Sequence, residues 1–151
     1  MHAANTLLLG LIAAATDTLA APPLNTRAQA VSAMAQAPEW IIRDFTRSCN
    51  ARGTACRVSF SIDTQTAPAT ECGFMISGAP AIQSSTSGIT CGPYTISSSW
   101  SGQFGPDNGF TTYSVIDWAN HLIIWPAYAD SEVQNGVSVT PDKSYAPQTL
   151  A

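Results

Sequence analysis

The stretch Arg57-Val58-Ser59-Phe60-Ser61-Ile62-Asp63 alternates apolar and polar residues without a break. A period of two places its three apolar side chains on one face of a β-strand, so one face is buried and the other meets water. Residues 40–47 mix apolar and charged residues in a similar way, with Ile42 as the single break in the alternation. Residues 50–54 between the two runs are turn formers. We therefore predict a β-hairpin here.

Strand-like segments continue toward the C-terminus, each bounded by glycine, proline or asparagine. They cover residues 72–76, 82–91, 94–97, 111–116, 121–125 and 137–139. The first two are expected to form a second hairpin, and residues 128–132 a single helical turn. Residues 106–109, Pro-Asp-Asn-Gly, fit a type I turn closed by a glycine with positive φ.

No amphipathic helix follows residue 39, so the fold class predicted is all-β. We expect a small antiparallel β-barrel, or a tightly packed sandwich, of seven to eight short strands with two disulfides. Closure into a barrel removes the exposed edges that a β-protein must otherwise protect.

The N-terminus is typical of a secretory leader. Residues 7–15 are apolar and uncharged, and small residues at 18–21 precede two prolines. This run is too short for a membrane anchor, which needs about 20 apolar residues. We predict a signal peptide over 1–20, a flexible arm or pro-segment over 21–38 and one domain over 39–151. The protein is then expected to be secreted and extracellular, with no membrane span.

An exported chain with an even number of cysteines is expected to form disulfides. The pairing Cys49–Cys56 with Cys72–Cys91 is favoured because each pair flanks a predicted turn. The rival pairing, Cys49–Cys72 with Cys56–Cys91, would join distant strands. Because no C-x-x-C occurs and only His121 remains after cleavage, we expect no metal site and no cofactor.

Charge is scarce and unevenly distributed. Charged residues make up 11% of the chain and the net charge is −4, which argues against a nucleic-acid partner. Four of the six basic residues fall within fifteen positions: Arg43, Arg47, Arg52 and Arg57. They are expected either to lie on a solvated strand face or to form a basic rim that docks onto an acidic partner.

The sequence offers no set of catalytic residues. His121 has Asp117 four residues before it, but no G-x-S-x-G nucleophile elbow occurs, so we predict no enzyme activity. The four tryptophans could stack on sugar rings, although tryptophans of small β-domains mostly pack in the core. As sugar platforms, Trp100 and Trp118 are favoured over Trp40 and Trp125 because they lie beside turns.

Four segments carry a resemblance to a known group: residues 40–49, 56–63, 100–110 and 141–145. Together they resemble small secreted proteins of filamentous fungi, including elicitors that induce the hypersensitive response. More distantly, the chain is similar to the fungal major-allergen-like β-barrel family. The resemblance covers residues 39–148, and its most specific part is the glycine-rich stretch from Trp100 to Phe110.

The resemblance implies a secreted effector, without known catalysis, that plant tissue perceives and answers with cell death and defence. Its partner would be a plant receptor or another apoplastic or cell-surface protein. Allergen-like members can dimerise through an additional cysteine. No cysteine is spare here, so a monomer or a weak non-covalent oligomer is expected. The alternative function is a secreted cell-wall carbohydrate-binding or weakly hydrolytic module.

The loop between Trp100 and Phe110 is the first candidate recognition surface. Its three glycines need no bulky neighbour for the loop geometry, yet aromatic residues bracket it. The candidate contacts are Trp100, Gln103, Phe104 and Asp107. The alternative is that the two bracketing rings turn inward and plug one end of the domain. In that case Arg43, Arg47, Arg52 and Arg57 are the next candidates.

Overall fold

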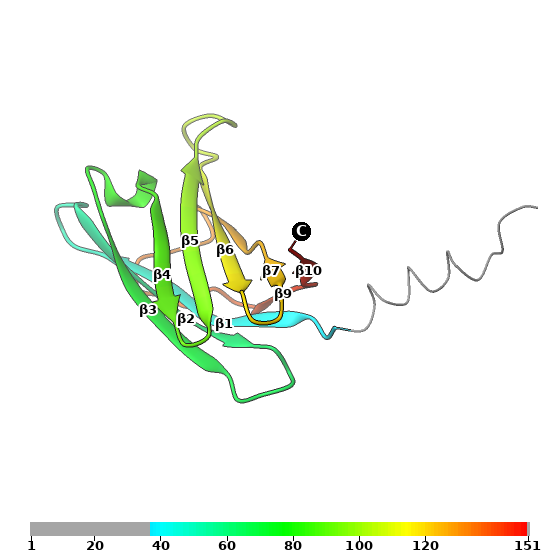
Figure 1. Cartoon of the computed structure of the whole chain (residues 1–151). Helices are drawn as coiled ribbons and strands as arrows, with labels where there is room; N and C mark the ends of the chain where they lie inside the picture. The colour runs from blue at the N-terminus through cyan, green and yellow to red at the C-terminus, as the bar shows by residue number, and fades with distance from the viewer. Residues whose placement is uncertain (1–36, 151) are drawn as a thin grey trace, which may run out of the picture.

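Two antiparallel sheets packed against each other make up residues 37–150, the part of the chain that the computed structural model describes (Figure 1). The first sheet has the order β3-β2-β1-β9; the second has the order β10-β7-β6-β5-β4, and β8 also pairs with β6. The strands are β1 (Trp40–Cys49), β2 (Ala55–Asp63), β3 (Thr70–Ser77), β4 (Thr86–Cys91), β5 (Tyr94–Ser101), β6 (Phe110–Asp117), β7 (Leu122–Ile124), β8 (Ala127–Ala129), β9 (Lys143–Tyr145) and β10 (Gln148–Thr149). The predicted signal peptide, and the predicted arm up to residue 36, lie outside the described residues.

The all-β prediction is confirmed, and the sandwich forms in place of the closed barrel. Within residues 37–150, no ladder joins β3 to β4 or β9 to β10, so the two sheets remain separate layers. The short 3₁₀ helix η1 (Ala81–Gln83) lies where the chain leaves the first sheet for the second. One edge of each sheet is protected by the shortness of its strand, because β9 has three residues and β10 has two. The opposite edge strands, β3 and β4, are longer.

A β-bulge in β1 changes which side chains face the core. The pairing register with β2 shifts between Arg43 and Thr46, and Asp44 takes a left-handed conformation with φ of 52°. The prediction that Ile42 breaks the alternation is therefore wrong, because Ile42 is buried and the break falls at Asp44. The extra residue turns Phe45 and Arg47 inward, where strict alternation would have left them outside.

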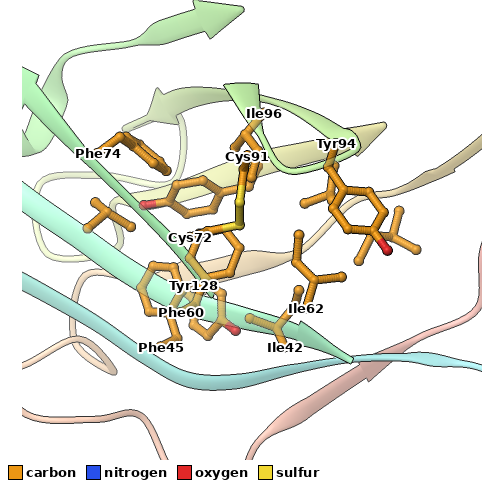
Figure 2. Close-up of a cluster of buried hydrophobic side chains, with 14 of the residues drawn as sticks. Ile42, Phe45, Phe60, Ile62, Cys72, Phe74, Cys91, Tyr94, Ile96 and Tyr128 are labelled. Atoms are coloured by element: carbon orange, nitrogen blue, oxygen red, sulfur yellow. A yellow bond between two sulfur atoms is a disulfide. The ribbon is translucent and has the colours of Figure 1, made fainter. Parts of the chain in front are cut away.

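Aromatic side chains from both sheets fill the centre of the sandwich (Figure 2). Phe45 stacks on Tyr128 with 3.9 Å between ring centroids and meets Tyr113 edge to face at 5.3 Å. Phe60 lies beside Phe45 at 5.8 Å. Such rings bury large apolar areas and interact favourably in stacked and edge-on arrangements, so they hold the two layers together.

Both predicted disulfides are present, although one has a different role from that expected. Cys49 and Cys56 lie opposite each other in the β1–β2 hairpin. Cys72 of β3 bonds to Cys91 of β4, and these strands belong to different sheets. The predicted hairpin over residues 72–91 is thus wrong. The Cys72–Cys91 bond lies within the core and crosslinks the two layers (Figure 2).

Three local predictions are also corrected. Residues 127–129 form a strand, because their backbone extends the edge of β6, and no helical turn spans 128–132. Residues 137–139 are not a strand: the Val139 N–H donates a single hydrogen bond to the Phe45 carbonyl. The 106–109 turn is not closed by a glycine with positive φ: the positive φ of 102° belongs to Gly105, which precedes the turn, and not to Gly109.

The tyrosines supply a test of this packing. Burial raises the pKa of all four above the ordinary 10.0, that of Tyr113 to about 12. The native state therefore favours the neutral phenols, so stability is complete below pH 10 and falls as the pH rises from 10 through the raised native values. We expect the native phenolate absorbance curve to lie at higher pH than that of the denaturant-unfolded chain. Coincident curves would contradict this packing.

Candidate functional site

The loop over residues 102–109 connects β5 to β6 and has a fixed backbone. The Gly105 N–H donates to the Gly102 carbonyl at 3.0 Å, and the Asn108 N–H donates to the Gly105 carbonyl at 3.1 Å. The Asn108 side-chain amide adds a bond of 3.2 Å to the Phe104 carbonyl. Two consecutive turns and one side-chain bond thus define the shape of a loop that is otherwise rich in glycine.

Trp100 lies against its own loop and is half-buried. A Cβ atom on Gly102 would come within 2.5 Å of the Trp100 ring, and one on Gly109 within 2.9 Å. These two glycines are therefore required by the close approach of the indole. Of the two orientations considered for the bracketing rings, the inward one is found for Trp100, so its ring supports the loop from beneath.

A partly buried carboxylate, that of Asp130, anchors this arrangement. The Trp100 Nε1–H donates to Oδ2 of Asp130 at 2.8 Å, and the Arg47 Nη1 donates to Oδ1 of the same carboxylate at 2.9 Å. Only 8% of the Arg47 side chain is exposed. The Asp130 N–H also donates to the Gly109 carbonyl at 2.8 Å. Asp130 thereby connects β1, the end of β5 and the end of the loop, a role that no local sequence pattern predicts.

The tip of the loop projects into solvent. Phe104 is 66% exposed and stacks on the half-buried Phe110 with ring centroids 5.7 Å apart and planes at 25°. Gln103 and Asp107 are exposed beside it. Three of the four candidate recognition residues in this loop are thus brought together at one accessible tip, with the fourth, Trp100, below them.

The arginines do not form a continuous basic rim. Arg47 is buried against Asp130, and Arg43 donates to Asp63 Oδ2 through Nε at 2.9 Å and Nη2 at 2.7 Å. The hydrogen bonds from Arg43 hold the pKa of the Asp63 carboxyl below its usual range. Arg52 and Arg57 are exposed, in the 50–54 turn and on the outer face of β2. Among residues 37–150, these two are the arginines without an ion pair, and they remain as candidates.

His121 and Asp117, considered as a catalytic pair in the sequence, have separate surroundings. The Asp117 carboxylate accepts the Asn120 backbone N–H at 3.1 Å and the Asn120 side-chain amide at 2.7 Å, which closes the turn after β6. His121 is exposed in that turn with φ of 52°. No hydrogen bond joins His121 to Asp117 in residues 37–150.

Among residues 37–150, no group of three or more His, Cys, Asp or Glu side chains is placed to hold a metal ion. None of the helices in that part of the chain has the length and apolar character needed to cross a membrane.

Comparison with known proteins places the chain among effectors. The family model described as Effector TSP1 matches residues 41–150. The chain is also 48% identical over 151 residues to the protein described as Effector TSP1 from Hypocrea virens (strain Gv29-8 / FGSC 10586), covering 99% of each chain. The resemblance to secreted fungal elicitors is thereby confirmed at the level of a fungal effector. The more distant likeness to the allergen-like family stays a prediction.

Proposed function

The chain belongs to the Effector TSP1 family and is a fungal effector, and from this we propose that it acts outside the cell by surface recognition, without catalysis. On this proposal the protein is secreted, and it induces cell death and defence in plant tissue by binding a cell-surface or apoplastic protein. The two disulfides support an extracellular site of action, because such bonds persist in oxidising environments.

The observation that carries the proposal is the exposed aromatic tip at Phe104. A large apolar ring that is 66% exposed, on a loop held by its own turns and by Asp130, loses little conformational freedom when a partner covers it. Exposed aromatics on ordered loops are typical energetic centres of protein interfaces. Gln103 and Asp107 flank this ring and supply polar contacts for the rim.

We expect the triple variant Gln103→Ala, Phe104→Ala and Asp107→Ala to fold normally and to require at least about a tenfold higher dose to induce leaf cell death. Tenfold corresponds to about 1.4 kcal/mol of binding free energy, within the range for an interface hot spot. The measurement is infiltration of pure protein into leaves over a dilution series. Circular dichroism and thermal unfolding establish that the variant is folded.

Two control variants make the result specific. Met75→Ala removes another exposed hydrophobic side chain, 52% exposed on β3, and should keep the parental dose. His121→Ala removes the predicted mature chain's only histidine and should also keep it. If the loop variant is as active as the parent, the loop is structural and Arg52 with Arg57 become the next surface. Loss of activity in folded His121→Ala would argue for catalysis.

A further inference from the structure

The second sheet is almost without charge. The strands β4 to β8 and β10 contain one charged residue, Asp117, and it is buried. On the outer face, five hydroxyl side chains form a two-column array: Thr95, Ser97 and Ser99 of β5, and Ser114 and Thr112 of β6, which pair with Ser97 and Ser99. Ile116 of β6, opposite Thr95, is the apolar member of these three rows. Thr95 and Ser99 are four residues apart on one strand, about 13 Å at the usual strand rise. The array is therefore long enough for an extended ligand to make several contacts.

Two exposed tryptophans lie on this same face. The Trp118 indole is 58% exposed, and its Nε1–H donates to Oγ1 of Thr95 at 3.0 Å, so the ring is held beside one end of the array. Trp125 is 51% exposed. It borders a shallow hollow of about 180 Å³ that is lined by Ser97, Ser98, Ser99, Thr112 and Ser114. The Trp118 indole thus lies near Thr95, and the Trp125 indole lies beside the serines that follow Thr95 on β5.

We propose that this outer face, defined by Trp118, Trp125 and the hydroxyl array between them, binds an extended, uncharged wall glucan. Sugar hydroxyls both donate and accept hydrogen bonds, as do the serine and threonine hydroxyls of the array. The apolar C–H faces of pyranose rings match the flat faces of exposed indoles. A glucan, whose polar groups are uncharged hydroxyls and ether oxygens, is complementary to a face of uncharged hydroxyls and exposed indoles.

Other occupants fit this face less well. A nucleic acid or an anionic polysaccharide needs basic side chains, and none lies on the strands of this sheet. Protein interfaces centre on apolar cores from which polar residues are displaced to the rim. Here the serines and threonines lie between the two indoles. The proposal is separate from recognition through Phe104, which lies on the loop beyond the ends of β5 and β6.

The test is depletion of the folded protein from solution by insoluble cellulose. We expect binding to cellulose, competition by soluble cello-oligosaccharides, and no change when salt is raised to about 1 M, because salt screens only charged contacts. Trp118→Ala and Trp125→Ala should each weaken binding about tenfold, and the double variant should abolish it. Phe104→Ala and Met75→Ala are the matched controls, with exposed hydrophobic side chains removed elsewhere, and should bind like the parent.

Three results would overturn the proposal. The first is that the parent is not depleted by cellulose, including the case in which it binds only chitin or an anionic polysaccharide. The second is that the folded double variant binds as well as the parent. The third is that sedimentation shows a dimer of the parent that the double variant converts to monomer, since the face is then an interface between copies. Leaf cell death is scored separately. A negative result for cellulose binding therefore does not affect the proposed function, which the Phe104 experiment tests.

Discussion

Replacing Cys72 and Cys91 with alanine is expected to lower the free energy of unfolding by about 3–5 kcal/mol. The bond closes a loop with a sequence separation of 19, for which chain entropy alone gives about 3 kcal/mol. The remainder comes from the core, because both cysteines are nearly fully buried between the two sheets and their loss leaves unfilled space. Denaturant unfolding without reductant measures the change directly.

The other disulfide provides the matched control. Cys49 and Cys56 are separated by seven positions within one hairpin whose ladder persists without the bond. Their replacement by alanine should cost about 2 kcal/mol, clearly less than the loss of Cys72–Cys91. Equal costs for the two variants would show that the crosslink between layers adds nothing beyond loop closure. Free thiols in the native protein, or a Cys56–Cys91 peptide after digestion, would contradict the pairing itself.

Replacing Asp130 with alanine is expected to cost about 3 kcal/mol and to loosen the loop over residues 102–109. The change leaves the Arg47 guanidinium, 8% exposed, without its partner, and uncompensated buried charge is strongly destabilising. It also removes the acceptor of the Trp100 indole N–H. Equilibrium unfolding gives the free-energy change, and amide hydrogen exchange of the loop reports the loosening.

Two comparisons isolate the cause of that loss. Asp107→Ala makes the same charge change at an exposed loop position and should alter stability by less than about 0.5 kcal/mol. Adding Arg47→Met to Asp130→Ala should recover much of the loss, because the unpaired buried cation is then gone. A double variant no more stable than Asp130→Ala alone would contradict an electrostatic origin. Asp130→Ala at parental stability would contradict the role of the pair altogether.

Alternation and turn chemistry were enough to predict the fold class, because both act over a few residues. The run 57–63 forms β2, and the turn over 50–54 contains Gly53 at φ of 66°. The disulfide pairing followed from the same local reasoning. Which sheet each strand joins depends on contacts distant in sequence, so β3 and β4 were wrongly placed in one hairpin.

The candidate site also combines features set by local sequence with features set by contacts distant in the sequence. Phe104, a candidate contact residue, is 66% exposed although it stacks on Phe110. The inward turn of Arg47 depends on the bulge at Asp44. The Asp44 backbone N–H donates to the Asp142 carboxylate at 3.0 Å, and these two residues are 98 positions apart in the sequence. No local pattern contains that partner. Trp100 was preferred to Trp125 as a sugar platform because it lies beside a turn. Its ring is half-buried because it reaches Asp130, 30 positions away, whereas Trp125 is 51% exposed.

The last strands of the domain have a consequence for its synthesis. β9 completes the first sheet by pairing with Trp40, Ile41 and Ile42, and β10 pairs with Leu122 and Ile123 in the second. Each sheet therefore lacks one of its edge strands until the segment over residues 143–149 has left the ribosome. Both sheets are therefore completed only once residues 143–149 are available for pairing, because these long-range pairings cannot form earlier.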